Sequence, residues 1–411
     1  LAAGINLPAR RVIVRDLTRY DDRVGMQTPI PTLEVQQMCG RAGRPGLDPS
    51  GEAVLLARSD EQVETYLDEY LSAPPEDVRS QLGSEPALRT HLLALVASGA
   101  VSNERELERF FEATFYGHTR PVVELDATVR TVRSFLEAHG FLEREERLRA
   151  TPFGALTSEL YLDPLSAVVL RQAVEKAPIG VGEFALLSAV AATPDLPPLF
   201  LRRGEERELL DRFVEEEPEL LVKPEEEPLR IDLDGFLSTL KTASVLEAWV
   251  RETPIVELTD RFGIGAGDLK AKVEDAEWLL FGALRIAQRF QRRSARALDA
   301  LSLRVRYGVR EELLDLVRLR GIGRVRGRAL HAAGLTDREA VRAASPGALE
   351  RVLRSPALVE SVRVQVGAAP PIGRRREART TPSRPTPSAP AVTPARSAPR
   401  SRRLEDYPAE P

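Results

Sequence analysis

The sequence predicts a multidomain, mainly α-helical protein that opens with a partial α/β lobe. Two observations carry this prediction. Short β-branched runs flank one helical run within the first 60 residues or so, and helical patterns then follow one another to about residue 366. A length of 411 residues leaves room for two to four domains, and 43% apolar residues can fill their cores.

The first segment, residues 1–73, is predicted to be the end of an α/β sheet domain. The run RRVIVRDL (10–17) is short and β-branched, which predicts a buried strand, and GEAVLLAR (51–58) predicts a second. Between them, PTLEVQQMCGRAG predicts a helix capped at Thr32 that ends in the glycine-rich stretch 40–46.

Residues 74–163 are predicted to form a winged-helix domain, because helical patterns precede a short charged hairpin and a further helix. Residues 164–297 are predicted to be a helical domain. Residues 298–366 contain LRGIGRVRGRAL, which predicts a helix-hairpin-helix with a Gly-Ile-Gly turn. The tail, residues 367–411, has ten prolines and almost no apolar run, which predicts disorder.

Composition excludes several classes of site. The net charge of −4 gives no global nucleic-acid signature, so any basic surface must be local. A single cysteine, Cys39, and four scattered histidines predict neither a disulfide nor a metal site. No membrane span and no secretory signal are recognisable, which predicts a cytoplasmic protein, weakly expected to be a monomer. Because the chain starts at Leu1 within domain-like sequence, we expect a fragment or a processed start.

The loop QQMCGRAGRPG (36–46) places Arg41 and Arg44 on a glycine-rich turn. Arginine forks bind phosphate oxygens and keep their charge. The loop that would cradle a triphosphate needs a Gly-Lys pair, and none occurs in the sequence, nor does an Asp-Glu-x-His or Asp-Glu-x-Asp metal box. The two arginines are therefore predicted to be half of a divided phosphate site.

A helical pattern from Gly265 to Arg296 carries Trp278 opposite its apolar stripe. At about 100° per residue the stripe faces away from Trp278, whereas arginines share the tryptophan's side. A tryptophan on a cationic face suits a single nucleic-acid strand, because a base can stack on the ring while arginines bind phosphates. The alternative is that Trp278 packs against a neighbouring domain. The stripe comprises Leu269, Val273, Ala276, Leu280, Ala283, Ala287 and Phe290, and the arginines are Arg285, Arg289, Arg292 and Arg296.

The Gly-Ile-Gly turn of the predicted helix-hairpin-helix lies in a basic stretch without acids. Backbone N–H groups at such a helix start can bind a phosphate, which favours sequence-independent DNA binding. The alternative is a purely structural hairpin. The surrounding arginines are Arg318, Arg320, Arg324, Arg326 and Arg328.

Two motifs resemble those of one enzyme family. AAGINLPARRVI (2–13) is similar to motif V of superfamily-two helicases, and QMCGRAGRPG (37–46) is similar to motif VI. The variants present resemble Ski-like helicases, and among them the archaeal DNA helicases related to the polymerase-theta helicase, over about residues 1–345. The resemblance implies that residues 1–73 belong to a second RecA-like domain and that residues 164–297 are a "ratchet" domain which moves one DNA strand.

The resemblance implies roles for particular residues. Arg44 would be the arginine finger, with Arg41 beside it and Gln37 in the same network. Gly4 and Asn6 would couple the nucleotide cleft to DNA, and Gly40 and Gly43 would border the nucleotide. Tyr20, on a hairpin at 16–31, could stack on the last base pair, or could simply pack on its own domain. Further DNA contacts are expected at Trp278, Lys270, Lys272, Arg285, Arg289, Arg320, Arg324, Arg326 and Arg328. Relatives often carry a basic residue at the position of Ala271, so that contact is in doubt.

The resemblance implies ATP and Mg²⁺ as cofactors, held mainly by a first RecA-like domain outside this sequence. It also implies single-stranded and forked DNA as partners, perhaps with replication-fork proteins, and 3′-to-5′ unwinding in repair of replication forks and recombination. The sequence alone would then be inactive as an ATPase. Two alternatives stay open: a non-enzymatic DNA-binding protein, and a Ski-like RNA helicase.

Overall fold

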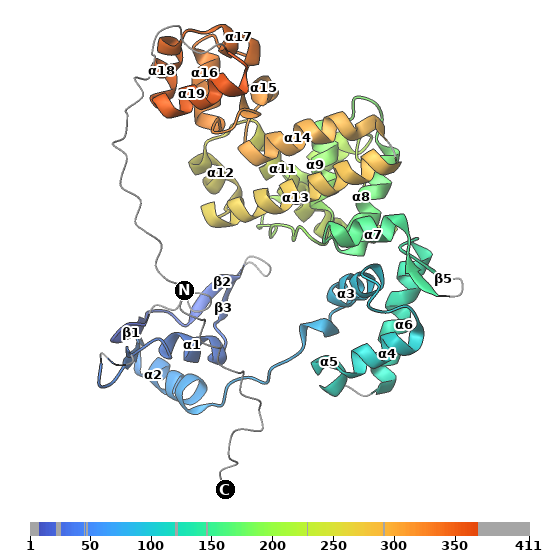
Figure 1. The fold of residues 1–411 in the computed structure, drawn as a ribbon. Coiled ribbons are helices and arrows are strands. Elements are labelled where there is room, and N and C mark those ends of the chain that lie inside the picture. Colours follow the sequence, from blue (N-terminus) through green and yellow to red (C-terminus); the bar gives the residue numbers. More distant parts are fainter. Residues whose placement is uncertain are drawn as a thin grey trace, which may run out of the picture. The chain divides into compact units, whose positions relative to one another are not determined.

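The structure is a computed structural model that describes residues 8–368, except residues 22–25, 45, 47, 120–121, 145–146, 228 and 291. The side chains of residues 20, 21, 122–126 and 144 are also outside the description. Helices make up most of the described chain, which confirms the mainly α prediction (Figure 1). The tail that was predicted to be disordered lies outside the described residues from residue 369 onward.

The N-terminal part contains a two-stranded parallel sheet of β1 (Arg11–Val14) and β4 (Glu52–Leu55). Parallel strands need a crossover connection, and α1 (Thr32–Cys39) lies in it. The same connection holds an antiparallel hairpin of β2 (Thr18–Asp21) and β3 (Met26–Pro29). The predicted strands, helix and hairpin are thus confirmed as elements. After β4 come α2 (Asp60–Tyr66) and a π-helical turn (Leu67–Ser72).

The start of α1 corrects one prediction. The residue before the helix is Pro31, and Thr32 makes no side-chain cap. Instead, the carboxylate of Glu76 accepts the backbone N–H groups of Thr32 and Leu33, at 2.6 and 2.9 Å. These backbone hydrogen bonds, from Leu33 foremost, lower the pKa of Glu76. An acid 44 residues along the chain replaces the local cap because a carboxylate can satisfy two free N–H groups at once.

Residues 74–163, which were predicted to form a winged helix, contain helices and a short hairpin. Its two short strands, β5 (Leu142–Arg144) and β6 (Leu148–Ala150), pair antiparallel and confirm the predicted charged hairpin. The helices of this segment are α3 (Glu85–Ala97), α4 (Glu104–Glu112), α5 (Phe115–Thr119), α6 (Val122–Ala138) and α7 (Pro152–Glu159), with a 3-10 turn at Gln81–Gly83.

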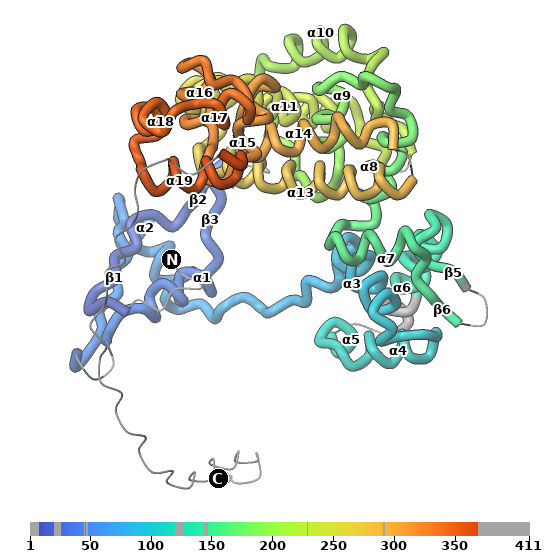
Figure 2. The backbone as a smooth tube through the Cα atoms, turned by 45° about the horizontal axis from the view of Figure 1, so that its top comes forward, coloured from blue at the N-terminus to red at the C-terminus, as the bar shows by residue number. Residues whose placement is uncertain are grey.

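A bundle of longer helices follows. The two helices α13 and α14 pack side by side, as Figures 1 and 2 both show. The bundle comprises α8 (Pro164–Lys176), α9 (Glu183–Ala191), α10 (Glu206–Glu216), α11 (Leu233–Val250), α12 (Ile255–Phe262), α13 (Ala266–Phe290) and α14 (Ala295–Tyr307), with a 3-10 turn (Arg292–Ser294) between the last two.

The last described part contains the predicted helical hairpin. Its first helix, α15 (Leu314–Val317), follows a 3-10 turn (Glu311–Leu313), and its second is α16 (Arg324–Ala332). Gly321 in the turn has a φ of +86°, a left-handed conformation that glycine adopts without strain. Three more helices complete this part: α17 (Arg338–Ala343), α18 (Pro346–Leu353) and α19 (Pro356–Gln365).

Among the described residues, buried apolar side chains form three clusters. A small one surrounds Val35 in the N-terminal part, and another runs from Val309 to Val362 around the hairpin. The largest runs from Leu88 to Val305 and contains residues of both the segment 74–163 and the bundle. These two parts therefore share one continuous hydrophobic core.

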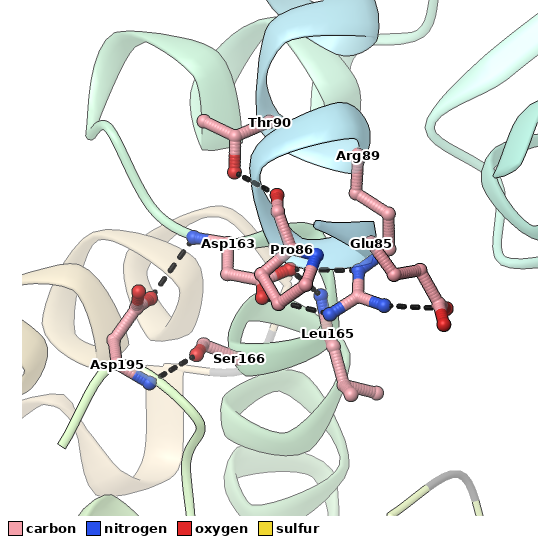
Figure 3. Close-up of polar contacts among 8 residues, drawn as sticks. All are labelled: Glu85, Pro86, Arg89, Thr90, Asp163, Leu165, Ser166 and Asp195. Atoms are coloured by element: carbon pink, nitrogen blue, oxygen red, sulfur yellow. Dashed lines mark hydrogen bonds and ion pairs between the residues drawn. The ribbon is translucent and has the colours of Figure 1, made fainter. Parts of the chain in front are cut away.

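A buried ion pair joins α3 to the start of α8 (Figure 3). The guanidinium of Arg89 donates to both carboxylate oxygens of Asp163, at 3.0 and 2.9 Å, and to Glu85 at 2.6 Å. Both Arg89 and Asp163 are 4% exposed. Asp163 also caps α8 by accepting the N–H of Leu165, and its own N–H donates to Asp195 at 2.9 Å. Burial alone lowers the pKa of Arg89, but the hydrogen bonds and charge of Asp163 raise it overall.

Removing the guanidinium of Arg89 measures how much this ion pair contributes to the free energy of unfolding. We expect Arg89→Met to lower the free energy of unfolding by about 3–5 kcal/mol, because it leaves the buried Asp163 carboxylate without its cation. Urea denaturation followed by circular dichroism measures the loss.

Lys223→Met is the matched control, because its pair with Glu217 is about half exposed on both sides. It should cost less than about 1 kcal/mol. Equal losses in the two variants would show that the Arg89 pair contributes no more than a surface contact.

Candidate nucleotide and nucleic-acid sites

The loop that carries the two predicted phosphate-binding arginines is tied to the start of β1. Ala9 donates its N–H to the carbonyl of Arg41 at 3.0 Å and accepts the N–H of Gly43 at 2.7 Å. Gly43 has a φ of +91°, and a Cβ there would lie 3.2 Å from Gly51. The close backbone approach therefore requires glycine at this position, which fits the glycine-rich pattern of the loop.

Arg44 is held by a near neighbour. Its Nε and Nη2 donate to the two carboxylate oxygens of Asp48, at 2.7 and 2.8 Å, and its backbone N–H donates to the same carboxylate at 3.1 Å. The side-chain hydrogen bond from Arg44 lowers the pKa of Asp48, and Asp48 raises the pKa of Arg44. Arg44 and Asp48 therefore both stay ionised at neutral pH, and the guanidinium of Arg44 binds the Asp48 carboxylate through two donors.

The other residues predicted for the nucleotide lie around this loop or outside the description. Arg41 is half-buried, and Gln37 is exposed on α1. Gly40 ends α1 with a helical φ of −64°, so it does not need to be glycine for its backbone angle. Gly4 and Asn6 lie outside the described residues. Tyr20 pairs with Gln27 in the β2–β3 hairpin, but its side chain is not described.

Trp278 lies on α13 and is half-buried against the large core. Its indole Nε1 donates to the backbone carbonyl of Leu160 at 2.9 Å, just beyond the end of α7. This contact fits the alternative interpretation of Trp278, in which the ring packs against a neighbouring part of the chain. The ring is fixed in place by the hydrogen bond while part of its surface stays accessible, so the structure leaves room for stacking.

The angular analysis of α13 is right for most of the core stripe and wrong at its end. Leu269, Val273, Ala276, Leu280, Ala283 and Ala287 are buried, but Phe290 is 40% exposed. The helix ends at Phe290, so Arg292 and Arg296 do not continue the line of Trp278. Leu279, Leu284 and Ile286 are buried as well, because α13 packs against α8, α9 and α14 and not against one layer alone.

Of the basic residues predicted on this helix, Arg285 and Arg289 are exposed. The guanidinium of Arg285 lies 5.9 Å from the ring centre of Phe281, itself 44% exposed. The sequence analysis missed Phe281, although its position one turn after Trp278 was a usable signal. Lys270 is exposed beside Glu274 at 3.6 Å, and Lys272 donates to the carbonyl of Pro197.

The arginines of the helical hairpin divide into two groups. Arg318 pairs with Asp299, and Arg328 pairs with Glu252 and Glu312. Arg324 donates to the carbonyl of Thr253 and lies 5.1 Å above the ring of Trp249. These three guanidinium groups are occupied by contacts that mostly reach the bundle.

Arg320 and Arg326 remain at the turn. Both are exposed. Arg326 donates to the carbonyl of Gly321 at 2.8 Å, and within the described chain the guanidinium of Arg320 has no recorded partner. Gly323 precedes α16 without a side-chain cap, so the first N–H groups of that helix are open to an anion.

No group of three or more His, Cys, Asp or Glu side chains among the described residues could hold a metal ion. Among those same residues, no helix is long and apolar enough to cross a membrane.

Comparison of the sequence with known proteins finds helicases. The model of the family "Archaeal helicase, domain 4" matches residues 184–308. The ATP-dependent DNA helicase Hel308 of Methanocella arvoryzae is 39% identical over 358 residues, which cover 86% of this chain and 48% of that protein. By sequence, the chain is similar to the Hel308-type archaeal helicases over most of its length. The Hel308 of Pyrococcus abyssi is 39% identical over 361 residues (86% and 49%), and that of Thermococcus kodakarensis is 41% identical over 360 residues (85% and 31%). The chain thus spans about half the length or less of these relatives.

Trp278→Ala tests whether the tryptophan of α13 stacks on single-stranded DNA. We expect it to weaken single-stranded DNA binding about 5- to 100-fold, since stacking on an aromatic ring is worth about 1–3 kcal/mol per base. Fluorescence anisotropy with a labelled oligonucleotide measures the affinity per folded molecule.

The control is Trp278→Phe, which keeps a stacking ring but loses the hydrogen bond to Leu160. It should lose about 1 kcal/mol of stability and keep most of the affinity. If both variants lose stability while DNA affinity per folded molecule is unchanged, Trp278 is only a packing residue.

Arg320→Ala and Arg326→Ala test the hairpin. Each should lower the slope of log K against log salt concentration by about 1, because one phosphate contact is lost, with little change in stability. Arg328→Ala should instead lower stability, because it leaves Glu252 without its partner. A salt slope that changes only in Arg328→Ala would contradict this division.

Proposed function

We propose that the chain is the part of an ATP-dependent DNA helicase that supplies an arginine finger and grips the translocated single strand. The observation that carries the proposal is the arginine loop at 41–44, in which the guanidinium of Arg44 binds both oxygens of one carboxylate. The chain aligns over 86% of its length with a protein named as an ATP-dependent DNA helicase. A fork that holds a carboxylate can hold the oxygens of a phosphoryl group in the same way.

In this proposal the nucleotide and Mg²⁺ are held by a lobe outside these 411 residues, because the sequence has no Gly-Lys phosphate loop and no acidic metal box. Arg44 reaches the γ-phosphate across the gap between the lobes, with Arg41 and Gln37 in the same network. Its guanidinium offsets the negative charge that spreads over the phosphoryl oxygens during transfer. The Asp48 carboxylate is the group that the phosphate replaces.

The DNA grip is proposed at α13 and at the helical hairpin. Trp278 and the exposed Arg285 and Arg289 bind the single strand, while Arg320 and Arg326 bind backbone phosphates. Lys270 is accessible for the same strand. Forked DNA, 3′-to-5′ movement and a role in replication-fork repair belong to the proposal through the resemblance to relatives named as DNA helicases.

The proposal is tested by joining the preceding half of the Methanocella relative to this chain and measuring DNA-stimulated ATP hydrolysis. Arg44→Ala is expected to lower kcat about 1,000-fold or more, the usual contribution of an arginine finger, with little change in nucleotide binding. The 411-residue chain alone should show no ATP turnover.

Arg58→Ala is the matched control, because Arg58 is an exposed arginine of the same part that also pairs with an aspartate, Asp16. It should leave kcat unchanged. Full activity of the Arg44→Ala protein, or turnover by the isolated chain, would rule out the proposed division of the site.

A further inference from the structure

The connection between α7 and α8 carries an aromatic side chain in an unusual place. Tyr161 has a φ of +58°, a left-handed backbone conformation that costs non-glycine residues energy. Its N–H donates to the carbonyl of Ser158, and the N–H of Leu162 donates to that of Thr157. These two bonds make the helix ending in which the left-handed residue is usually glycine.

The side chain of Tyr161 lies outside the packed core. Tyr161 is 81% exposed, and among the described residues its phenol makes no recorded hydrogen bond or ring contact. A strained backbone that holds a large exposed aromatic outward suggests that the ring serves a ligand.

The location of the turn identifies the ligand class. The carbonyl of Leu160, one residue before Tyr161, is the acceptor that fixes the indole of Trp278. Tyr161 also borders an apolar hollow of about 730 Å³ whose lining includes Leu93, Ala94 and Phe110. An exposed aromatic ring one residue along the chain from the carbonyl that holds the proposed strand-binding tryptophan fits the flat face of a nucleobase.

The turn is also rigid, which a stacking platform needs. Two residues after Tyr161, Asp163 is locked by Arg89 and by the hydrogen bond from its N–H to Asp195 (Figure 3). Burial raises the pKa of Asp195. The position of Tyr161 is thus fixed from both sides, by the end of α7 and by the buried pair.

We propose that Tyr161 stacks on a base of the same single DNA strand that Trp278 contacts. The DNA-binding surface would then extend from α13 to the connection between α7 and α8. This inference rests on the proposed function, because it takes single-stranded DNA as the ligand. It adds a contact residue outside α13 and outside the helical hairpin.

Tyr161→Gly separates a ligand role from a structural one. Glycine relieves the backbone strain, so the melting temperature should stay the same or rise by roughly 2–4 °C. Affinity for a labelled single-stranded oligonucleotide should fall about 5- to 20-fold, because the stacking ring is gone. Tyr161→Phe restores the ring and should recover the lost affinity.

Glu225→Gly is the control, because Glu225 is also exposed and has the same φ of +58°. It should show the change in melting temperature without the loss of DNA affinity. Photocrosslinking of the unsubstituted chain to an oligonucleotide with 5-iodouracil adds a direct measure, and a crosslink mapped to Tyr161 by mass spectrometry is expected.

The outcomes are distinguishable. If Tyr161→Gly binds as tightly as the parent and no crosslink forms at Tyr161, while Trp278→Ala weakens binding, the inference is overturned and the proposed function stands. If the chain does not bind single-stranded DNA at all, the proposed function fails with it.

Discussion

The buried pair of Arg89 and Asp163 is the interaction on which the arrangement of the residues proposed to bind DNA depends. Arg89 belongs to α3, in the segment predicted to be a winged helix, whereas Asp163 caps the first helix of the bundle. Three residues before Asp163 lies Leu160, whose carbonyl holds the indole of Trp278. Because a buried charge is costly without its partner, this contact ties α3 to the start of α8. The chain that leads from α7 to α8 thereby positions the carbonyl that holds the ring of Trp278 on α13.

The positions of the acidic residues determine which of the arginines predicted to bind phosphates already form ion pairs. The guanidinium of Arg44 donates to Asp48, so in the proposed function a phosphate has to compete with that carboxylate for the same two donors. The competition would favour phosphoryl groups that carry more negative charge than one carboxylate. A side chain that is already ordered loses less conformational entropy on binding than a free side chain does. In the proposed function, Asp48 therefore keeps the Arg44 side chain ordered at the loop until the phosphate replaces it.

Local sequence pattern predicted the helices and strands well. It failed for contacts between residues that lie far apart along the chain. The hairpins, the parallel strands and the buried stripe of α13 follow from periodicity and turn residues within short windows. The cap of α1 could not be predicted, because its acceptor is Glu76, far along the chain. Nor could the partners of Arg324 and Arg328, which come from the segment around Glu252. Sequence placed five arginines in one basic stretch, but only tertiary contacts show which of them are already neutralised.

The division of the arginines into paired and exposed ones bears on the proposed DNA-binding surface. If all the predicted arginines were free, DNA binding would be mostly electrostatic and would weaken strongly at moderate salt. With Arg318, Arg324 and Arg328 committed to Asp299, Thr253 and Glu252, fewer phosphate contacts remain, and aromatic stacking must carry a larger share of the affinity. Stacking is indifferent to base identity and less sensitive to salt than phosphate contacts. In the proposed function, a strand held mainly by stacking can advance past fixed rings without sequence preference, as a motor that moves along DNA requires.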